Sequence, residues 1–323
     1  MEKIFIFGKA LWDVILRTDV KLEKDRFSLP FREKTIIKDF LQEPGGGVIN
    51  VAMSLKNLGF DVLPQALIGK DHAGEGIREV LQERKIYTHL IGSTKYQTGT
   101  SIVILGENGL HTALIYSGAN SYVRASDFDF RELKEARWWF ILSWGNTDEK
   151  IIEKIIVNKE KLGKHLAFNP GKIQLESVEK IKPLLRVADI LFVNEKELSL
   201  LLGKKIKTKE LKEALVEAVG LGPKIVVVTL GIRGSVVYDG GHYFSTPILK
   251  AKVVDSLGCG DAYSSAFLAY FLKTGKIEKA ILAGTINSSS VVSAKGAIAG
   301  LLDEKKIDKK FEKVRIKIKK ENI

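Results

Sequence analysis

The stretch "DSLGCGDAYSSAFLAYFL", residues 255–272, joins bare backbone, one carboxylate and an apolar helix. Three small residues, Gly258, Cys259 and Gly260, come directly before Asp261. A helix N-terminus presents unpaired N–H groups and a partial positive charge, and small residues let the backbone approach a bound anion. A carboxylate there would repel the anion, but it could accept the proton of a hydroxyl that attacks the anion. Amides that hold developing charge, paired with such a base, suit phosphoryl transfer.

A purely structural explanation of the same stretch is also open. The residues could form a tight turn in which Asp261 caps the helix. The stretch is not a dinucleotide fingerprint, because G-x-G-x-x-G would need glycine where Tyr263 stands. No G-x-x-x-x-G-K-[ST] sequence occurs in the chain, which excludes a P-loop. These residues alone do not decide between catalysis and capping.

A second glycine cluster favours the catalytic explanation. In "EPGGGVINVAMSLKNLG", residues 43–59, three glycines that include Gly46 and Gly47 precede a helix with Asn50 in its first turn. Upstream, Asp13 lies just past the end of the first expected strand, and the carboxyl ends of parallel strands are where α/β sheets bind ligands. A carboxylate and an amide amid bare backbone can fix the hydroxyls of a polyol.

The elements that must position these residues alternate along most of the chain. Near-continuous apolar runs separated by amphipathic ones indicate a parallel sheet covered on both faces. We expect strands at 3–8, 138–143, 165–169, 189–194 and 224–231, and a hairpin at 234–244. We expect helices at 48–59, 147–163, 175–186 and 195–203, and from Asp261 and Ile277 onward.

A second group of strands does not fit a parallel core, because its residues alternate in a polar or two-sided way. These runs lie at 14–20, 33–40, 99–106 and 111–118. They indicate a small sheet that covers a cleft, with lid strands inserted at about 12–20, 33–42 and 98–118. No internal repeat or low-complexity linker occurs, so a single domain over residues 1–323 is expected.

Several motifs resemble those of the ribokinase-like (PfkB) carbohydrate kinase family. "GGGVINVAMSLKNLG" and "DSLGCGDAYSSAFL" are similar to its two signature motifs. "TGTSIVILGENGLHTALIYSGAN" (98–120), "NEKE" (194–197) and "TLGIRG" (229–234) resemble further landmarks in the family's order. The resemblance implies an α/β ribokinase-like three-layer fold with a mostly parallel central sheet and a small β-sheet lid. It also implies a sugar kinase that transfers the γ-phosphoryl group of ATP to a hydroxymethyl group.

The same resemblance implies a role for individual residues. Asp261 would be the general base, and the backbone amides of Gly258, Cys259 and Gly260 would form the anion hole. The other assignments are acceptor binding by Asp13, Gly46, Gly47 and Asn50, nucleotide binding by Asn194, Thr229, Gly231 and Gly234, Mg²⁺ binding through water by Glu197, and binding of a monovalent cation by Asp255 and Gly296. The implied cofactors are ATP and Mg²⁺, with K⁺ as a further candidate.

Departures from the common family patterns leave the acceptor open. The glycine motif lacks the lysine of typical ribokinases and is closest to a version seen in sugar-phosphate kinases, whereas "GKALWDV" resembles kinases of free sugars. "FVN" stands where those sugar-phosphate kinases carry "KPN", and Lys172 lies where many members have a D-x-N-x-R-like stretch. We expect a kinase of a small free sugar. A nucleoside kinase, a sugar-phosphate kinase and a non-catalytic sugar-binding protein are the alternatives.

The single cysteine lies inside the candidate anion hole. Family members usually carry a small residue such as Ala at the position of Cys259, and cysteine is small enough to replace it. A thiol at a helix N-terminus tends to a lowered pKa and high reactivity where solvent reaches it. We therefore predict that alkylation of Cys259 inactivates the protein.

Composition excludes several other classes of protein. Hydrophobic residues make up 45% of the chain and charged residues 28%, as in an ordinary globular enzyme. The apolar N-terminal run breaks at Gly8, so neither a signal peptide nor a membrane span is expected there. One cysteine excludes an internal disulfide and fits the cytoplasm, and no histidine stands at metal-ligand spacing from another, which argues against zinc.

The net charge of +12 is concentrated toward the C-terminus. Residues 303–323 hold nine Lys or Arg against five Asp or Glu, with Phe311 as their aromatic residue and no nucleic-acid-binding motif. We therefore expect no nucleic-acid partner. Alternation at Val314, Ile316 and Ile318 predicts a half-buried edge strand instead. The expected partners are ATP, a small acceptor and a second copy of the chain joined through the lid.

Overall fold

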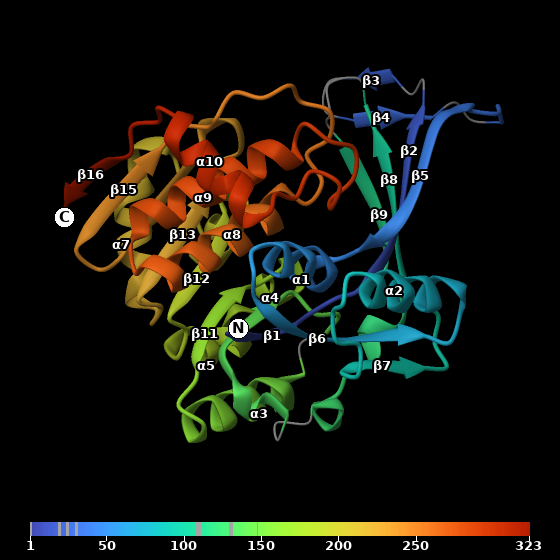
Figure 1. Cartoon of the computed structure of the whole chain (residues 1–323), viewed down its shortest axis with the longest axis horizontal. Coiled ribbons are helices and arrows are strands. Elements are labelled where there is room, and N and C mark those ends of the chain that lie inside the picture. Colours follow the sequence, from blue (N-terminus) through green and yellow to red (C-terminus); the bar gives the residue numbers. More distant parts are fainter. Residues whose placement is uncertain are drawn as a thin grey trace.

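A computed structural model describes residues 2–18, 21–23, 26–29, 32–106, 111–128, 132–146 and 148–323. Within these residues the main sheet has ten strands in the order β16-β15-β14-β13-β12-β11-β10-β1-β6-β7 (Figure 1). Neighbours from β7 to β13 pair in parallel, and β14, β15 and β16 continue the sheet in antiparallel pairing. The strands are β1 (Lys3–Phe7), β6 (Asp61–Gly69), β7 (Ile91–Thr94), β10 (Ala136–Leu142), β11 (His165–Asn169), β12 (Ile190–Asn194), β13 (Ile225–Thr229), β14 (Ser235–Tyr238), β15 (His242–Thr246) and β16 (Lys319–Asn322).

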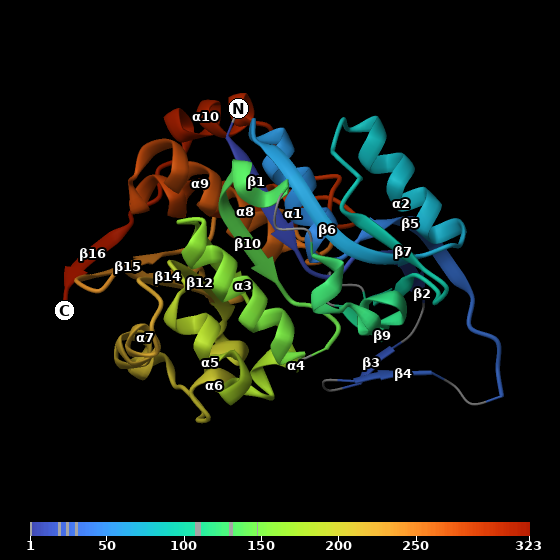
Figure 2. The ribbon, with the colours of Figure 1, turned by 90° about the horizontal axis from the view of Figure 1, so that it is seen from below.

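Helices cover both faces of this sheet (Figure 2). One layer consists of α1 (Gly47–Asn57), α2 (His72–Glu83), α8 (Cys259–Thr274), α9 (Ile277–Val291) and α10 (Glu304–Lys313). The other layer consists of α3 (Glu149–Lys161), α4 (Lys172–Leu175), α5 (Val178–Arg186), α6 (Glu195–Leu201) and α7 (Leu211–Gly220). Successive residues of a strand point to opposite faces, so Ile4 and Ile6 belong to one buried cluster and Phe5 and Phe7 to the other. The predicted three-layer α/β fold is confirmed.

A separate sheet stands beside α1 and α2, in the order β5-β2-β8-β9 (Figure 1). Its strands are β2 (Leu11–Thr18), β5 (Ile37–Gly45), β8 (Gly99–Leu105) and β9 (His111–Tyr116). β3 (Lys21–Glu23) and β4 (Arg26–Ser28) form a further two-stranded pair. Parts of the strands expected at 12–20 and 98–118, namely residues 19–20 and 107–110, lie outside the described residues, as does residue 147 at the start of an expected helix. We call the four-stranded unit the small sheet.

The edge strand predicted around residues 314–318 lies a few residues further along the chain. Residues 314–318 alternate between half-buried and exposed, but they form no strand. Val314 and Ile318 pack against the core, and the edge strand follows as β16, whose four residues are all exposed. The burial pattern was therefore right, whereas the hydrogen-bonded ladder lies just beyond it. Among the described residues, no helix is both long and apolar enough to cross a bilayer.

Candidate active site

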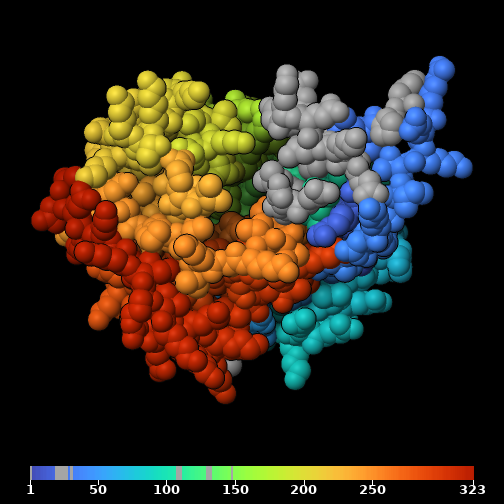
Figure 3. Space-filling view, turned by 90° about the horizontal axis from the view of Figure 1, so that it is seen from above, coloured from blue at the N-terminus to red at the C-terminus, as the bar shows by residue number. Residues whose placement is uncertain are grey.

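A pocket of about 210 Å³ opens at the carboxyl ends of three neighbouring strands. Asn169, Asn194 and Thr229 are the last residues of β11, β12 and β13, and all three line it. Its opposite wall is the start of α8, which contributes Gly258, Gly260 and Asp261, and Glu197 of α6 also lines the pocket. Figure 3 shows this side of the molecule hollowed between the orange chain near residue 250 and the olive chain near residue 200. The pocket thus gathers residues predicted as base, anion hole and nucleotide site.

Asp261 is held by a residue of the other glycine cluster. The Asn50 side-chain amide donates a 2.8 Å hydrogen bond from Nδ2 to Asp261 Oδ2. Burial raises the pKa of the Asp261 carboxyl, and the bond from Asn50 opposes this rise by favouring the ionised form. Asn50 is itself 5% exposed, and its Oδ1 is buried without a hydrogen-bond partner. A buried acceptor beside the candidate base is therefore left for a ligand that donates a hydrogen bond.

The turn before α8 needs its glycines for two different reasons. Gly258 caps the helix in the left-handed conformation with φ of +71°, and a Cβ there would lie 2.6 Å from the Cβ of Ala297. A Cβ at Gly260 would meet no atom within 4 Å. Gly258 is thus required by close packing, whereas Gly260 leaves the wall of the pocket bare. The Cys259 N–H donates to the Ser256 backbone oxygen at 3.5 Å, whereas the N–H groups of Gly260 and Asp261 belong to the first turn of α8 and have no acceptor within the helix.

Asp13 lies on β2 of the small sheet and is 3% exposed. Its direct neighbours across the sheet are Glu43 on β5 and Ser101 on β8. Burial and the charge of Glu43 raise the pKa of Asp13 to about 7, and a hydrogen bond from Ser101 opposes the rise. A Cβ at Gly45 would lie 1.8 Å from Asp13 Oδ2, so only glycine fits beside this carboxylate.

The two predicted acceptor glycines follow Gly45 directly, and the second of them lies near Asp261. Gly46 caps α1 with φ of +81°, and a Cβ there would lie 2.6 Å from the backbone oxygen of Lys9. A Cβ at Gly47 would lie 3.9 Å from Asp261 Oδ1. The bare backbone of the cluster therefore brings the small sheet and the base close together, as the acceptor prediction requires.

Asn194 and Glu197 bond each other reciprocally at the start of α6. The Asn194 side chain accepts from the Glu197 N–H at 2.9 Å, and Glu197 Oε2 accepts from the Asn194 N–H at 2.8 Å. This is a capping box, which stabilises the helix whatever else the residues do. Burial raises the pKa of Glu197, while the N–H bond from Asn194 lowers it. Sequence reasoning predicted the ligand role of this motif and missed its capping role.

Of the "TLGIRG" motif, Thr229 alone is among the residues that line the described pocket. Gly231 and Gly234 flank a short 3₁₀ turn with φ of +59° and +92°. A Cβ at Gly234 would lie 1.9 Å from the backbone oxygen of Thr246. The shape of the turn is a sufficient reason for both glycines, and their nucleotide-binding role stays a prediction.

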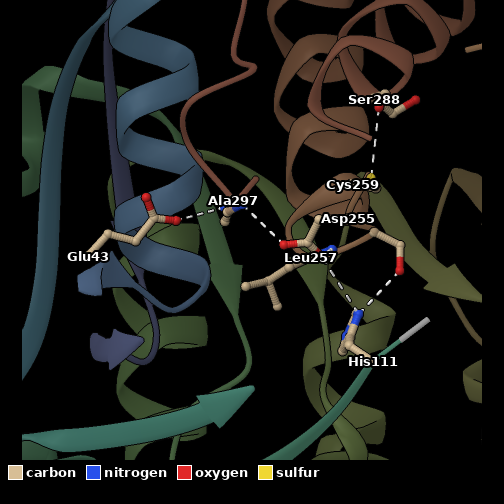
Figure 4. Close-up of polar contacts among 9 residues, drawn as sticks. Glu43, His111, Asp255, Leu257, Cys259, Ser288 and Ala297 are labelled. Carbon is tan, nitrogen blue, oxygen red and sulfur yellow. Dashed lines mark hydrogen bonds and ion pairs between the residues drawn. The ribbon is translucent and has the colours of Figure 1, made fainter. Parts of the chain in front are cut away.

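Asp255 is completely buried in the loop before α8 (Figure 4). Its Oδ1 accepts from the Leu257 N–H at 2.9 Å and its Oδ2 from the Gly296 N–H at 3.1 Å. His111 Nδ1 of the small sheet lies 3.9 Å from Oδ1. Both predicted cation-binding residues are therefore adjacent. In the described part of the chain, no cluster of three or more His, Cys, Asp or Glu side chains could hold a metal.

The structure does not favour the predicted reactivity of the Cys259 thiol. Burial, followed by the charges of Asp255 and Asp261, raises the pKa of the Cys259 thiol to about 12. The Sγ atom lies 3.8 Å from the backbone oxygen of Ser288 on α9 (Figure 4), and Cys259 is not among the pocket-lining residues. The side chain points into the helix packing, so the favourable effect of the helix N-terminus does not determine its ionisation.

Two residues near the site, Asn169 and Glu43, were not predicted, and Lys172 lies on the surface. Asn169 lines the pocket and donates from Nδ2 to the Phe192 backbone oxygen at 2.7 Å. Its place at the end of an expected strand was the available indication. Glu43 lies two residues before the glycine cluster, and no local sequence pattern distinguishes it. The Lys172 side chain is 78% exposed and pairs with Glu176 at 3.5 Å on the surface.

Comparison with known proteins gives the family. The model of the pfkB family carbohydrate kinases matches residues 1–304, and the chain belongs to this family. An ATP-dependent 6-phosphofructokinase of Thermoanaerobacterium thermosaccharolyticum is 25% identical over 307 residues, which cover 92% of this chain and 93% of that protein. A nucleoside kinase of Methanocaldococcus jannaschii is 26% identical over 322 residues, with 98% and 99% coverage. The structure of ribokinase from Giardia lamblia matches with a TM-score of 0.82 at 21% identity, over 97% of this chain and 99% of that one.

The family assignment settles the class of reaction. Carbohydrate and nucleoside kinases of the pfkB family are phosphotransferases that act on hydroxyl groups, and this chain is such an enzyme. The relatives' names cover a sugar phosphate kinase, a nucleoside kinase and a ribokinase, so they do not select one acceptor.

Proposed function

We propose that this protein transfers the γ-phosphoryl group of ATP to a hydroxymethyl group of a small sugar, with Asp261 as the general base and the amides of residues 258–260 as the anion hole. The observation that carries the proposal is the placement of Asp261 at the pocket wall formed by the start of α8, held by Asn50 from the second glycine cluster. An anion at the helix N-terminus would lie beside the base. An acceptor hydroxyl positioned between the anion and Asp261 could lose its proton as it attacks.

Asn50 supports the assignment of the acceptor side. Its buried Oδ1 lacks a partner, and burial of an unpaired acceptor costs roughly 1–3 kcal/mol. A sugar hydroxyl would satisfy it as a donor. Asp13, buried on the small sheet, would accept from a second hydroxyl, and Gly46 and Gly47 leave room for the ring. Closure of the small sheet over the acceptor would exclude water from the phosphoryl group.

The residues present also fit ATP with Mg²⁺. Glu197 uses Oε2 in the capping box, which leaves Oε1 for a water of the metal, and the carboxylate lines the same pocket as Thr229. Mg²⁺ keeps several of its waters and, when bound, supplies positive charge that neutralises the phosphates. Asn194 and Thr229 would contact the nucleotide at the strand ends. Asp255 and Gly296 would bind K⁺ beside the anion hole, in a protein that we place in the cytoplasm.

The acceptor is tested by a panel in a coupled assay of ATP consumption. The panel contains free pentoses and hexoses, nucleosides and sugar phosphates, each with Mg²⁺ and with Na⁺ or K⁺. Highest kcat/KM on a free sugar supports the proposal. If kcat/KM is highest on a nucleoside or a sugar phosphate, that compound replaces the free sugar as the proposed acceptor, and the proposed mechanism is unchanged. Sugar binding by calorimetry without turnover on any compound would favour the non-catalytic alternative.

The base is tested by Asp261→Asn. The substitution preserves shape and a hydrogen-bond acceptor for Asn50, so nucleotide affinity should stay close to wild type. The kcat should fall by at least about 10²-fold, the lower range for loss of an acid–base group. Asp39→Asn is the control, because Asp39 is a half-exposed acid on β5 paired with Lys295. Turnover within a few fold of wild type in Asp261→Asn would refute the mechanism.

A homodimer formed through the small sheet is part of the proposal. Phe40, Ile102, Leu114 and Tyr116 lie on the face of this sheet opposite Asp13 and are 53%, 38%, 59% and 54% exposed. Clustered apolar residues on one sheet face are typical of a protein interface. Leu114→Lys should halve the mass measured by light scattering, while Ile232→Lys, at an 86% exposed position on another element, should leave it unchanged. A wild-type monomer at all concentrations would exclude this interface.

A further inference from the structure

Three consecutive residues, Lys295, Gly296 and Ala297, are each bound by a different acidic side chain. Lys295 Nζ lies 2.7 Å from Asp39 Oδ1, the Gly296 N–H donates to Asp255 Oδ2 at 3.1 Å, and the Ala297 N–H donates to Glu43 Oε1 at 2.8 Å. Asp39 and Glu43 belong to β5 of the small sheet, whereas Asp255 belongs to the loop that leads into α8. We call residues 295–297 the bridging turn, because it joins these two parts of the fold (Figure 4).

The bridging turn is closely packed on its β5 side. Glu43 is 8% exposed, and a Cβ at Gly296 would lie 2.2 Å from Glu43 Oε1. Gly296 also has φ of +83°, so glycine is required there by both conformation and space. The contact with Glu43 is therefore buried and specific, unlike the half-exposed ion pair of Asp39 with Lys295.

The other side of the turn reaches the candidate anion hole. Asp255 binds the Gly296 N–H with one oxygen and the Leu257 N–H with the other, and Leu257 is followed directly by Gly258. The backbone position of Gly258 is limited by Ala297, since a Cβ at Gly258 would lie 2.6 Å from the Ala297 Cβ. The Leu257 side chain packs against Ile15 and Val103 of the small sheet. Movement of the small sheet would therefore reach the Gly258–Gly260 amides through two routes, one from β5 through the bridging turn and one from β2 and β8 through Leu257.

A carboxylate at position 43 is costly in this place. Glu43 is the direct cross-strand neighbour of Asp13, another buried acid, and like charges in that arrangement destabilise a sheet. The described contacts give Glu43 one evident task, which is the bond to Ala297. A bond that joins two parts of the site is a reason for retaining a buried hydrogen-bond acceptor at position 43.

We infer that Glu43 is a positioning residue that couples the small sheet to the anion hole through the bridging turn. Docking of β5 on the turn fixes Asp255 and the Gly258–Gly260 amides in their anion-binding arrangement. Ligand at the start of α8 and closure of the small sheet then favour each other, because coupling between two sites is reciprocal. Glu43 lines no part of the described pocket and acts through Ala297. The inference rests on the proposed function for the identity of the anion, which is the phosphate chain of ATP.

The test uses hydrogen exchange on the whole protein with and without AMP-PNP and Mg²⁺. The variants are Glu43→Ala, which removes the acceptor; Glu43→Gln, which keeps it; and Asp39→Asn, the control on the same strand and turn. In wild type, Glu43→Gln and Asp39→Asn, the nucleotide should slow exchange directly at 255–262 and remotely at 37–45 and 295–297. The remote effect should be at least about five-fold, the lower range for coupled sites. In Glu43→Ala the direct effect should persist and the remote effect should vanish.

Two outcomes would overturn the inference: remote protection that is absent in wild type although 255–262 is protected, or remote protection of equal size in Glu43→Ala. If the alanine variant does not fold, Glu43→Thr takes its place, because its hydroxyl is too short to reach Ala297. Absence of any nucleotide effect at 255–262 would instead count against the proposed function. The coupling is then judged on the free protein, where Glu43→Ala should speed exchange at both 295–297 and 255–262. Faster exchange confined to 295–297 would refute it.

Discussion

Replacing Asp13 by Asn should stabilise the free protein at pH 8 far more than at pH 5. Asp13 is a buried carboxyl next to Glu43, and burial and that neighbour raise its pKa from 3.8 to about 7. Asn has nearly the same shape, keeps an acceptor for Ser101 and fits beside Gly45. It carries no charge at any pH of the experiment, so it removes the cost of ionising position 13 in the folded state.

The sign and size of the effect follow from proton linkage. The folded protein holds the Asp13 proton more tightly than the unfolded chain does, so the stability from this carboxyl is complete below pH 3.8 and is lost as pH rises toward about 7. One pKa unit corresponds to about 1.4 kcal/mol, so the wild type loses roughly 2–3 kcal/mol between pH 5 and pH 7 through Asp13. Burial likewise raises the pKa of Glu43 to about 7, so this carboxyl shares part of the cost. The advantage of Asp13→Asn should therefore grow by about 2 kcal/mol from pH 5 to pH 8.

The measurement is urea unfolding at several pH values between 5 and 8, followed by tryptophan fluorescence and without substrates. Asp39→Asn is the control, because a hydrogen bond from Lys295 lowers the pKa of Asp39 and its side chain is half exposed. Its effect should be small and opposite in sign. A free-energy difference between Asp13→Asn and wild type that is the same at pH 5 and pH 8 would refute the reasoning. Loss of acceptor binding in the stabilised variant would show that the carboxyl of Asp13 lowers the stability of the protein but is needed for acceptor binding.

Two further predictions concern the start of α8. Alkylating reagents should modify Cys259 much more slowly than a free thiol at pH 7.5, because burial raises the pKa of Cys259 to about 12. The labelling is followed by mass spectrometry, and rapid labelling would contradict the burial of the thiol. Cys259→Ala should keep near-wild-type kcat. Gly258→Ala should destabilise the fold by about 1–3 kcal/mol, because the new Cβ would clash with Ala297 and the residue would still need a left-handed φ. Gly260→Ala should fold normally and chiefly weaken nucleotide binding, because a Cβ there meets no atom. Thermal unfolding and calorimetry separate these outcomes, and equal stability of the two variants would be evidence against the assigned turn geometry.

The local parts of the fold were predictable because each rests on a pattern within a few residues. The apolar runs that became β10, β11, β12 and β13 are nearly continuous. The first three are each followed by a helix whose periodicity is clear, and β13 is followed by the expected hairpin of β14 and β15. The glycine clusters indicated helix starts, and both α1 and α8 begin there. In contrast, no strand was predicted at β6, which contains Pro64, a residue that disfavours a central strand. Pro64 is tolerated there since β7 pairs with β6 only from Ala66 onward.

Contacts between distant segments could not be predicted from the same patterns. Asp13 and Glu43 are thirty residues apart, and their pairing depends on the register of β2 and β5. The Ala297 N–H reaches Glu43 from the opposite end of the sequence. The Cys259 pKa likewise depends on α9 packing over the thiol, which no local pattern contains. Burial and register, which arise only in the folded chain, decided each of these points.

The position of Asn50 shows how the packing of the helices prepares the site. Ser54, one turn further along α1, has its hydroxyl 2.7 Å from that of Ser265 on α8 and accepts from Asn287 Nδ2 on α9 at 3.2 Å. These buried bonds fix α1 against α8 and thereby hold Asn50 Nδ2 at 2.8 Å from Asp261. A donor in that place favours the ionised carboxyl, which burial alone would disfavour. The Oδ1 of the same amide is buried without a partner, so a hydroxyl that donates to it would lie next to a carboxyl whose orientation the Asn50 hydrogen bond already fixes.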